Sequence, residues 1–417
     1  MFILRFFLVS QLQITARTQV WASTLHIDYG VQPNAAMHAV CRKVQGIPYE
    51  PPKPQGMKAN LKVLVDVSVR SNPEPMPADT LAPGFGSWAH PKLVGEMTGS
   101  SLVLRQKSLR YANGKMMAPV EIASFLEAGI VPALNIAAPD EDEEVRTLTS
   151  SALARLAREP NGREQMLKHS SIKVLQKLVK DSVQEVRANC LTAILELGRD
   201  PSGCAALIDA GCVKLLVDAA PAEAPELQAP SLAALRICMM QSAGLAEAIA
   251  TGAILTMIGM LAAESPSTRE YAALCLAALT VELGEKTVAR KGDAIGKLVE
   301  LLETEAEAKA VTAQLAALMS LTVENEGKHE AVEKKAYKVL LPLLQQSALL
   351  ELQGGMTPAT CTLTVNVAKC IANIAEAPKG RKKLQPALEQ LRPLAESSEM
   401  LVRKHAAAAV ERVTWKP

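Results

Sequence analysis

The stretch from residue 172 to residue 213, IKVLQKLVKDSVQEVRANCLTAILELGRDPSGCAALIDAGCV, decides the fold, because its pattern of apolar and small residues recurs along the chain. An apolar residue that opens a helix just after a glycine or another small residue returns in steps of 41 or 42 residues, at Val131, Ile172, Val213, Ile254, Ile295 and Tyr337. Self-similarity at a fixed period of roughly 20 to 50 residues is the signature of a repeat architecture.

Two further ladders run in phase with the first. A small residue followed by an apolar residue, two variable positions and another apolar residue begins at Ala152, Ala193, Ala234, Cys275, Ala317, Cys370 and Ala409. A glycine follows a few residues later, at Gly162, Gly203, Gly244, Gly284, Gly327 and Gly380. Because glycine takes the left-handed conformation without steric cost, we expect these glycines to end the helix before them.

Each period predicts three helices: a short one after the glycine, a second such as 172–180, and a longer third such as 185–198. This organisation is typical of armadillo and HEAT repeats. A single repeat cannot bury its apolar stripe alone, so neighbouring repeats stack. We therefore predict an all-α, armadillo-type α-solenoid, a superhelix of about seven to eight three-helix repeats.

The composition agrees with this fold and narrows the function classes. The 417 residues are 49% hydrophobic but only 3% aromatic, which favours helices with an Ala- and Leu-rich core. A formal net charge of +2 gives no strong overall field for nucleic acid or an anionic membrane. No apolar run reaches the ~18 residues of a membrane span. The eight cysteines contain no Cys-x-x-Cys pair, which indicates reduced, buried thiols.

The two ends of the repeat pattern define the domains. Residues 46–91 hold nine prolines, so 1–90 is predicted to be an irregular N-terminal arm and 91–417 the solenoid. Residues 61–69 alternate like a strand, which fits addition to a partner's sheet edge, a local hairpin or no ordered element. Residues 1–27 contain no Asp or Glu, as in a targeting segment such as an organelle transit peptide, or in a wrongly assigned start.

A step of 53 residues between Ala317 and Cys370 predicts a loop insertion near 345–360, either a passive loop or a docking element.

The chain shows no pattern of catalytic or metal-binding residues. None of the six histidines has a second ligand at metal-binding spacing on one helix. Residues 292–297, GDAIGK, resemble a phosphate-binding loop but are one residue short and lack the Ser/Thr. The acidic run 140–144 fits helix capping. We expect no enzymatic activity, no metal, no cofactor and no small-molecule substrate.

Two basic runs are interpreted as solvated surface by default, with contact with an acidic partner as the functional alternative. They contain Lys334, Lys335 and Lys338, and Lys379, Arg381, Lys382 and Lys383.

The armadillo resemblance implies a partner groove along the third helices, where an Asn ladder clamps extended peptides in the peptide-binding families. The positions equivalent to that ladder hold Arg155, Glu196, Ile237, Ala278, Ser320, Asn373 and Arg412, and Lys369 stands at one of the accompanying Trp positions. Since only Asn373 keeps the Asn, cargo carriage in the manner of nuclear-import receptors is not expected. The small, apolar centre of the groove favours a packed helix or a folded subunit.

Three segments narrow the resemblance further: LVLRQKSL at 102–109, EAPKGRKKLQ at 376–385 and VTWKP at 413–417. Together they resemble the armadillo-type radial spoke proteins of motile cilia, the radial spoke head 14 homologue group, over residues 87–417. The resemblance implies a non-enzymatic structural subunit of the axonemal radial spoke. It would lie in the cytoplasm and the cilium or flagellum and bind other spoke subunits. A soluble armadillo adaptor or trafficking receptor in the cytoplasm stays open as the alternative.

Overall fold

The computed structural model describes residues 77, 79–82 and 84–416, and a compact unit covers Ala78–Pro417. Over the described residues the chain is helical and contains no strand, in agreement with the predicted fold class. The predicted targeting segment at 1–27, the strand pattern at 61–69 and most of the arm at 1–90 lie outside the described residues.

The described part begins with η2 (Gly86–Trp88), α4 (Ala89–Glu96) and α5 (Leu102–Lys115), and seven three-helix repeats follow. The first helices are α6 (Pro119–Glu127), α9 (Pro160–Lys168), α12 (Pro201–Asp209), α15 (Ser242–Ala250), α18 (Leu283–Lys291), α21 (Asn325–Glu333) and α24 (Pro378–Lys383). The second helices are α7 (Ile130–Ala137), α10 (Ser171–Leu178), α13 (Cys212–Ala219), α16 (Ala253–Met260), α19 (Ala294–Thr304), α22 (Tyr337–Leu352) and α25 (Leu388–Leu394). The third helices are α8 (Glu143–Arg158), α11 (Gln184–Leu197), α14 (Pro225–Cys238), α17 (Pro266–Leu279), α20 (Ala308–Leu321), α23 (Pro358–Ala375) and α26 (Met400–Thr414). Two short 3-10 turns, η3 (Ala220–Ala222) and η4 (Gln385–Ala387), lie in the third and last repeats.

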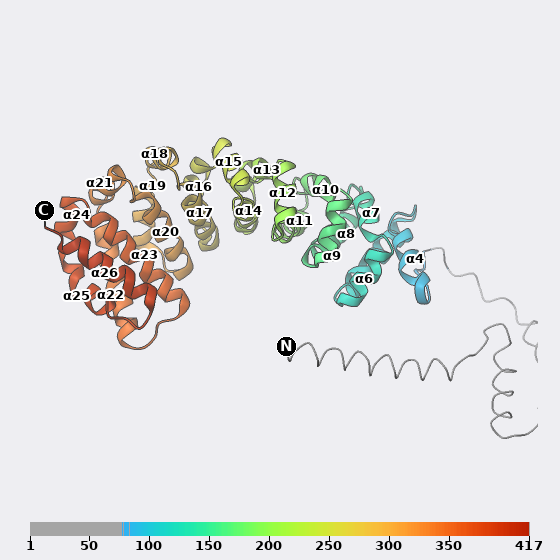
Figure 1. Cartoon of the computed structure of the whole chain (residues 1–417). Coiled ribbons are helices and arrows are strands. Elements are labelled where there is room, and N and C mark those ends of the chain that lie inside the picture. Colours follow the sequence, from blue (N-terminus) through green and yellow to red (C-terminus); the bar gives the residue numbers. More distant parts are fainter. Residues whose placement is uncertain (1–76, 78, 83, 417) are drawn as a thin grey trace, which may run out of the picture. The chain divides into compact units, whose positions relative to one another are not determined.

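The repeats are joined mainly through their third helices. Each third helix packs on that of the next repeat, from α8 on α11 to α23 on α26, and α5 packs on α8 in the same way. Figure 1 shows the helices following one another in a row. The small residues of the second ladder lie on these third helices, and all seven are fully buried: Ala152, Ala193, Ala234, Cys275, Ala317, Cys370 and Ala409. The thiols of Cys275 and Cys370 lie 3.7 Å and 3.4 Å from carbonyls of the preceding third helix. A small side chain lets two helices approach closely, so the ladder sets the spacing of the stack.

The glycine ladder has a different cause from the predicted one. Gly162, Gly203, Gly244, Gly327 and Gly380 lie inside the first turns of first helices, not at left-handed helix ends. A Cβ at Gly203 would lie 2.0 Å from the carbonyl oxygen of Leu197, in the last turn of the preceding third helix. These glycines are therefore needed for close packing. Gly284 departs from the ladder, because a Cβ there would meet nothing within 4 Å.

The left-handed residues form a ladder of their own at the bend between first and second helices. Their φ angles are 80° at Gly129, 57° at Ser170, 76° at Gly211, 79° at Gly252, 57° at Asp293 and 63° at Lys335. Three of the six are not glycine, so glycine content alone could not reveal this ladder.

The insertion predicted as a loop near 345–360 is largely helical. The second helix α22 has 16 residues where α10 has 8, and the third helix α23 has 18 where α11 has 14. Only residues 353–357 of the segment lie outside these helices. The prediction was wrong because residues 345–352, QQSALLEL, are good helix formers, and Ser347 and Ala348 are buried.

Within the described residues, no single helix is both long and apolar enough to cross a membrane. Two pairs, Pro119–Glu127 with Ile130–Ala137 and Ser242–Ala250 with Ala253–Met260, meet the length and composition requirement together but are bent by 81° and 80°.

The glycine finding yields a matched pair of substitutions. Gly203→Ala places a methyl group against the Leu197 carbonyl and should lower the free energy of unfolding by about 1–3 kcal/mol. Gly284→Ala has open space and should raise it by about 0.5–1 kcal/mol, since alanine is the better helix former. Urea unfolding of both variants measures the difference. Equal effects would contradict the packing explanation.

Candidate protein-binding surface

The predicted groove residues all lie on third helices. Arg155 is on α8, Glu196 on α11, Ile237 on α14, Ala278 on α17, Ser320 on α20, Lys369 and Asn373 on α23, and Arg412 on α26. Because the third helices stack in series, these positions follow one another from repeat to repeat. Most occupy the C-terminal half of their helix.

At the C-terminal repeats, these side chains bind the preceding repeat. The Asn373 side-chain amide donates to the carbonyl of Met319 at 3.2 Å and to the Thr322 hydroxyl at 3.3 Å. The Ser320 hydroxyl donates to the carbonyl of Thr280 at 2.6 Å, and Arg412 forms an ion pair with Glu376. The side chain expected to clamp a ligand therefore holds its own neighbour.

The remaining positions are also engaged within the solenoid. Glu196 pairs with Arg199 at 2.9 Å, and the Arg155 guanidinium contacts the sulfur of Met117. Ile237 packs so closely on Gly198 that a Cβ there would lie 2.6 Å from the isoleucine Cγ2. Ala278 and Lys369 are half-buried. A binding role for this set stays a prediction, while most of its contacts join one repeat to another.

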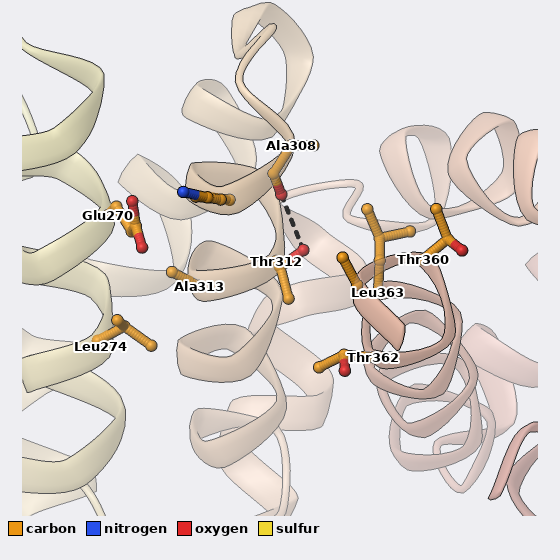
Figure 2. Close-up of a pocket in the computed structure, with 10 residues that line it drawn as sticks. Glu270, Leu274, Ala308, Thr312, Ala313, Thr360, Thr362 and Leu363 are labelled. Atoms are coloured by element: carbon orange, nitrogen blue, oxygen red, sulfur yellow. Dashed lines mark hydrogen bonds between the residues drawn. The ribbon is translucent and has the colours of Figure 1, made fainter. Parts of the chain in front are cut away.

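An open hollow lies nearer the N-terminal ends of the third helices α17, α20 and α23. It has a volume of about 270 Å³ and is lined by Glu270, Leu274, Ala308, Lys309, Thr312, Ala313, Ala359, Thr360, Thr362 and Leu363. Figure 2 shows Glu270 and Leu274 on one side, Thr312 and Ala313 in the middle, and Thr360, Thr362 and Leu363 on the other. The lining is mainly apolar, with charge at its margin, which suits an apolar side chain of a protein partner.

The insertion builds one wall of this hollow. The first turn of α23 supplies Ala359, Thr360 and Thr362, and α23 is four residues longer than α11. A capping box fixes this turn, because the Thr357 and Thr360 side chains each accept a hydrogen bond from the other's backbone N–H. Alignment to the armadillo consensus missed the hollow, whereas the step of 53 residues was a usable signal.

A ladder of arginine–carboxylate pairs, which we call rungs, also joins the repeats. The rungs are Arg105–Asp140 at 2.9 Å, Arg146–Asp181 at 2.7 Å, Arg187–Glu223 at 3.0 Å and Arg269–Glu305 at 2.7 Å. Arg105 lies near the start of α5 and the other three arginines near the start of third helices, and each carboxylate lies before the next third helix. This ladder was not predicted from the sequence, although the four arginines are spaced by 41, 41 and 82 residues.

Each rung arginine also binds the bend of its own repeat. The Arg146 Nη1 donates to the carbonyls of Asp140 at 3.1 Å and Glu141 at 3.0 Å, six and five residues earlier. Arg269 repeats this pattern with Ala263 at 2.9 Å and Glu264 at 2.7 Å. The guanidinium fork thus ties two backbone carbonyls to one carboxylate, a geometry that lysine cannot supply.

Residues of the acidic run 140–144 have two different roles, helix capping and pairing with a rung arginine. The Asp142 carboxylate caps α8 by accepting from the Val145 N–H at 2.9 Å, as predicted. Asp140 belongs to the first rung, a role that the sequence did not reveal.

The rungs are partly buried, so their charges interact strongly. The Glu305 side chain is 2% exposed, and the hydrogen bond from Arg269 lowers the pKa of its carboxyl below the ordinary value. Burial alone would raise the pKa of Asp181, but the hydrogen bonds from Arg146 and the Val183 N–H outweigh it and lower that pKa. The carboxylates of Glu305 and Asp181 therefore stay ionised at neutral pH.

The two basic runs, separate in the sequence, meet in the fold. Lys383 Nζ lies 5.9 Å from the centre of the Tyr337 ring, which joins α24 to the start of α22. Lys334 pairs with Asp293 at 2.7 Å, and Arg381 stacks on Trp415 at 4.5 Å. Both interpretations, solvated surface and contact with an acidic partner, stay open.

No metal-binding cluster is formed in the part of the chain that the structure covers. It holds no group of three or more His, Cys, Asp or Glu side chains placed around a metal. Burial raises the pKa of Cys212 to about 11 and of Cys238 to about 12, so these thiols are poor nucleophiles. In the phosphate-loop-like stretch, a Cβ at Gly296 would lie 2.4 Å from the Asp293 carboxylate, so an acidic group occupies the start of α19.

The stacked three-helix repeats define an armadillo-type α-solenoid, a fold that typically serves as a protein-binding scaffold without catalytic activity. An engineered protein matches with a TM-score of 0.68 and 22% identity over 79% of each chain. A designed armadillo repeat protein matches with a TM-score of 0.50 and 21% identity, over 55% of this chain and 99% of its own. A chain from a structural study of the cadherin–beta-catenin interaction matches with a TM-score of 0.61 and 17% identity, over 78% of this chain and 60% of its own.

At the level of sequence, the chain is 32% identical to Radial spoke protein 14 of Chlamydomonas reinhardtii over 120 residues. The match covers 28% of this chain and 31% of that protein, so the chain spans about a third of the length of this relative. No protein-family model matches the chain. The resemblance to an armadillo-type radial spoke protein, predicted from three short segments, is confirmed by this similarity.

The rungs predict a pH dependence. A carboxyl whose pKa is lowered on folding contributes stability above its ordinary value, 4.5 for Glu305, and loses it as the pH falls through the folded value. Arg269→Gln should therefore cost about 1–3 kcal/mol at neutral pH, because Glu305 loses its partner, and less as acid protonates that carboxyl. Urea unfolding of wild type and variant at a series of pH values measures both effects.

Arg158→Gln is the matched control, because Arg158 is exposed and forms no ion pair with a described residue. It should leave stability unchanged at every pH. A pH-independent cost of Arg269→Gln would contradict the electrostatic account of the rungs.

Proposed function

We propose that this chain is a non-catalytic protein-interaction scaffold and a structural component of the axonemal radial spoke in cilia or flagella. The observation that carries the proposal is the similarity to Radial spoke protein 14, joined to an armadillo-type solenoid. Its partners would be other protein subunits of the spoke, and its location the axoneme. Nucleic acid, membrane, metal, cofactor and small-molecule substrate have no place in this proposal.

The solenoid suits a structural role because several kinds of contact hold each repeat against the next. Third helices pack through small buried residues, and the rungs tie consecutive bends together. Each repeat depends on its neighbours, so a partner that spans several repeats stabilises them together. A stiff row of repeats can hold subunits at fixed separations.

The hollow between α17, α20 and α23 is the proposed seat of one partner subunit. Leu274 and Leu363 are half-buried on its two sides, with the buried Ala313 between them. Leu349 and Leu352, in the additional turns of α22, are 51% and 75% exposed, so the insertion also offers an apolar surface. An apolar side chain from a helix or a folded subunit fits this surface better than an extended basic peptide does.

The test is rescue of ciliated cells that lack the protein. Wild type should return to the detergent-insoluble axoneme and resist salt extraction. Thr312→Arg places a long cation in the hollow and should move most of the protein to the soluble fraction. Thr287→Arg on α18 is the matched control. In each threonine the hydroxyl donates a hydrogen bond to the carbonyl four residues earlier, at 2.8 Å for Thr312 and 3.1 Å for Thr287, so both substitutions remove the same kind of bond.

Two results would contradict the proposal at different points. Wild type wholly in the detergent-soluble pool would reject the axonemal role and favour a soluble adaptor. Wild type in the axoneme together with full retention of Thr312→Arg would keep that role and reject the hollow as the docking site.

A further inference from the structure

The arginine ladder is interrupted at its fourth position, in the third repeat. Counting 41 residues on from Arg187 leads to Gln228 on α14, and 41 on from Glu223 leads to Glu264. The cation of this rung is missing while its carboxylate is kept. Glu264 is exposed, and among the described residues no Lys, Arg or His lies within ion-pair distance of it.

Gln228 makes only part of the bonding that an arginine makes at the intact rungs. Its side-chain amide donates to the carbonyl of Glu223, five residues earlier, at 3.3 Å. The carbonyl six residues earlier, which each rung arginine also reaches, belongs here to Ala222 and receives no bond from Gln228. The carbonyls and the carboxylate that a rung arginine would bind are thus present here, but no guanidinium binds them.

An open hollow lies at this interrupted rung. It has a volume of about 470 Å³ and is lined by both Gln228 and Glu264, together with Pro225, Leu255 and Met260. Leu255 is 58% exposed, so one wall is apolar and reachable from solvent. The hollow is formed by the N-terminal end of α14, by α16 and by the bend after it. It is therefore separate from the hollow on α17, α20 and α23.

We propose that this hollow receives an arginine side chain from a protein partner. The guanidinium would pair with Glu264 and donate to the carbonyls of the bend before α14, completing the rung in trans. The aliphatic stem of the arginine would lie on Leu255 and Met260. The inference goes beyond the proposed scaffold function, because it assigns a second docking point and the chemistry that it recognises.

Arginine is favoured over lysine by the four intact rungs. In each, one planar guanidinium bridges backbone carbonyls and a carboxylate of the next repeat, as Arg187 does at 2.9 Å and 3.1 Å to Asp181 and Ser182. A compact ammonium cannot reach the same acceptors at once. The recognised group is therefore a forked cation, and not positive charge in general.

The test uses the full chain with isotope-labelled Leu and Met methyl groups and three probes. N-acetyl-arginine amide should shift the methyl signals of Leu255 and Met260. N-acetyl-citrulline amide, which has nearly the same shape without the charge, should not, and N-acetyl-lysine amide should bind more weakly than the arginine probe. Glu264→Gln should weaken the arginine probe roughly tenfold, the loss expected for a charge-assisted hydrogen bond.

Two variants complete the design. Gln228→Arg supplies the missing cation within the chain, so it should abolish probe binding and raise the melting temperature. Glu226→Gln is the matched control, because Glu226 is exposed on the same turn of α14 and lies outside the hollow. It should bind the arginine probe like wild type.

Equal shifts with the citrulline or lysine probe would overturn the proposal, as would undiminished binding to Glu264→Gln. If Gln228→Arg fails to fold, the comparison of Glu264→Gln with Glu226→Gln still decides the question. If wild type is found wholly in the detergent-soluble pool but still binds the arginine probe, the proposed function is rejected and the arginine site is retained.

Discussion

Close packing between consecutive third helices is the constraint on which the rest of the structure depends. It requires a small side chain at one position of every repeat, and Ala or Cys stands there in all seven, fully buried. The packing of each first helix on the third helix before it adds a second requirement, a glycine in most first helices, because the first helix crosses directly over a carbonyl. These two requirements hold the period near 41 residues, since a shift of one residue would turn a larger side chain into the contact.

Electrostatics adds a second set of bonds between the same repeats. The rungs join consecutive bends, and Arg163 pairs with Asp200 while donating to carbonyls at the end of α8. A cation near helix carbonyls also offsets the negative end of the helix dipole. Because each repeat interacts mainly with its neighbours, one missing rung leaves the stack intact. This tolerance allows an interrupted position such as Gln228 to serve binding instead of stability.

The sequence was sufficient for the fold class, the repeat period and the packing ladder, because each of these requires a particular residue type at a fixed position. It was not sufficient for the cause of the glycine ladder, since the clash at Gly203 is with a carbonyl of another helix. The left-handed bend was hidden because Ser170, Asp293 and Lys335 replace glycine there. The insertion was expected to be a loop because insertions in solenoids usually fall in loops, whereas here residues 345–352 extend α22.

The site was harder to predict than the fold. The consensus Asn position led to residues such as Asn373 that bind their own neighbours. The hollow depends on the extra turn of α23, and a turn added to a helix has no motif of its own. The arginine ladder was visible in the spacing, but its function as a bridge needed the contacts. Residue types at fixed positions of the repeat therefore predicted the stacking of the helices better than the candidate binding surface.

Hydrogen exchange after disturbing one packing position tests the central claim most directly. Ala193→Leu overfills the contact of α11 with its neighbours, where Ala193 is fully buried. If third-helix packing between neighbours holds the solenoid, exchange should accelerate in α8, α11 and α14 and stay unchanged in α23 and α26. Uniform acceleration across all repeats, or acceleration in α26 with α14 unaffected, would contradict this account.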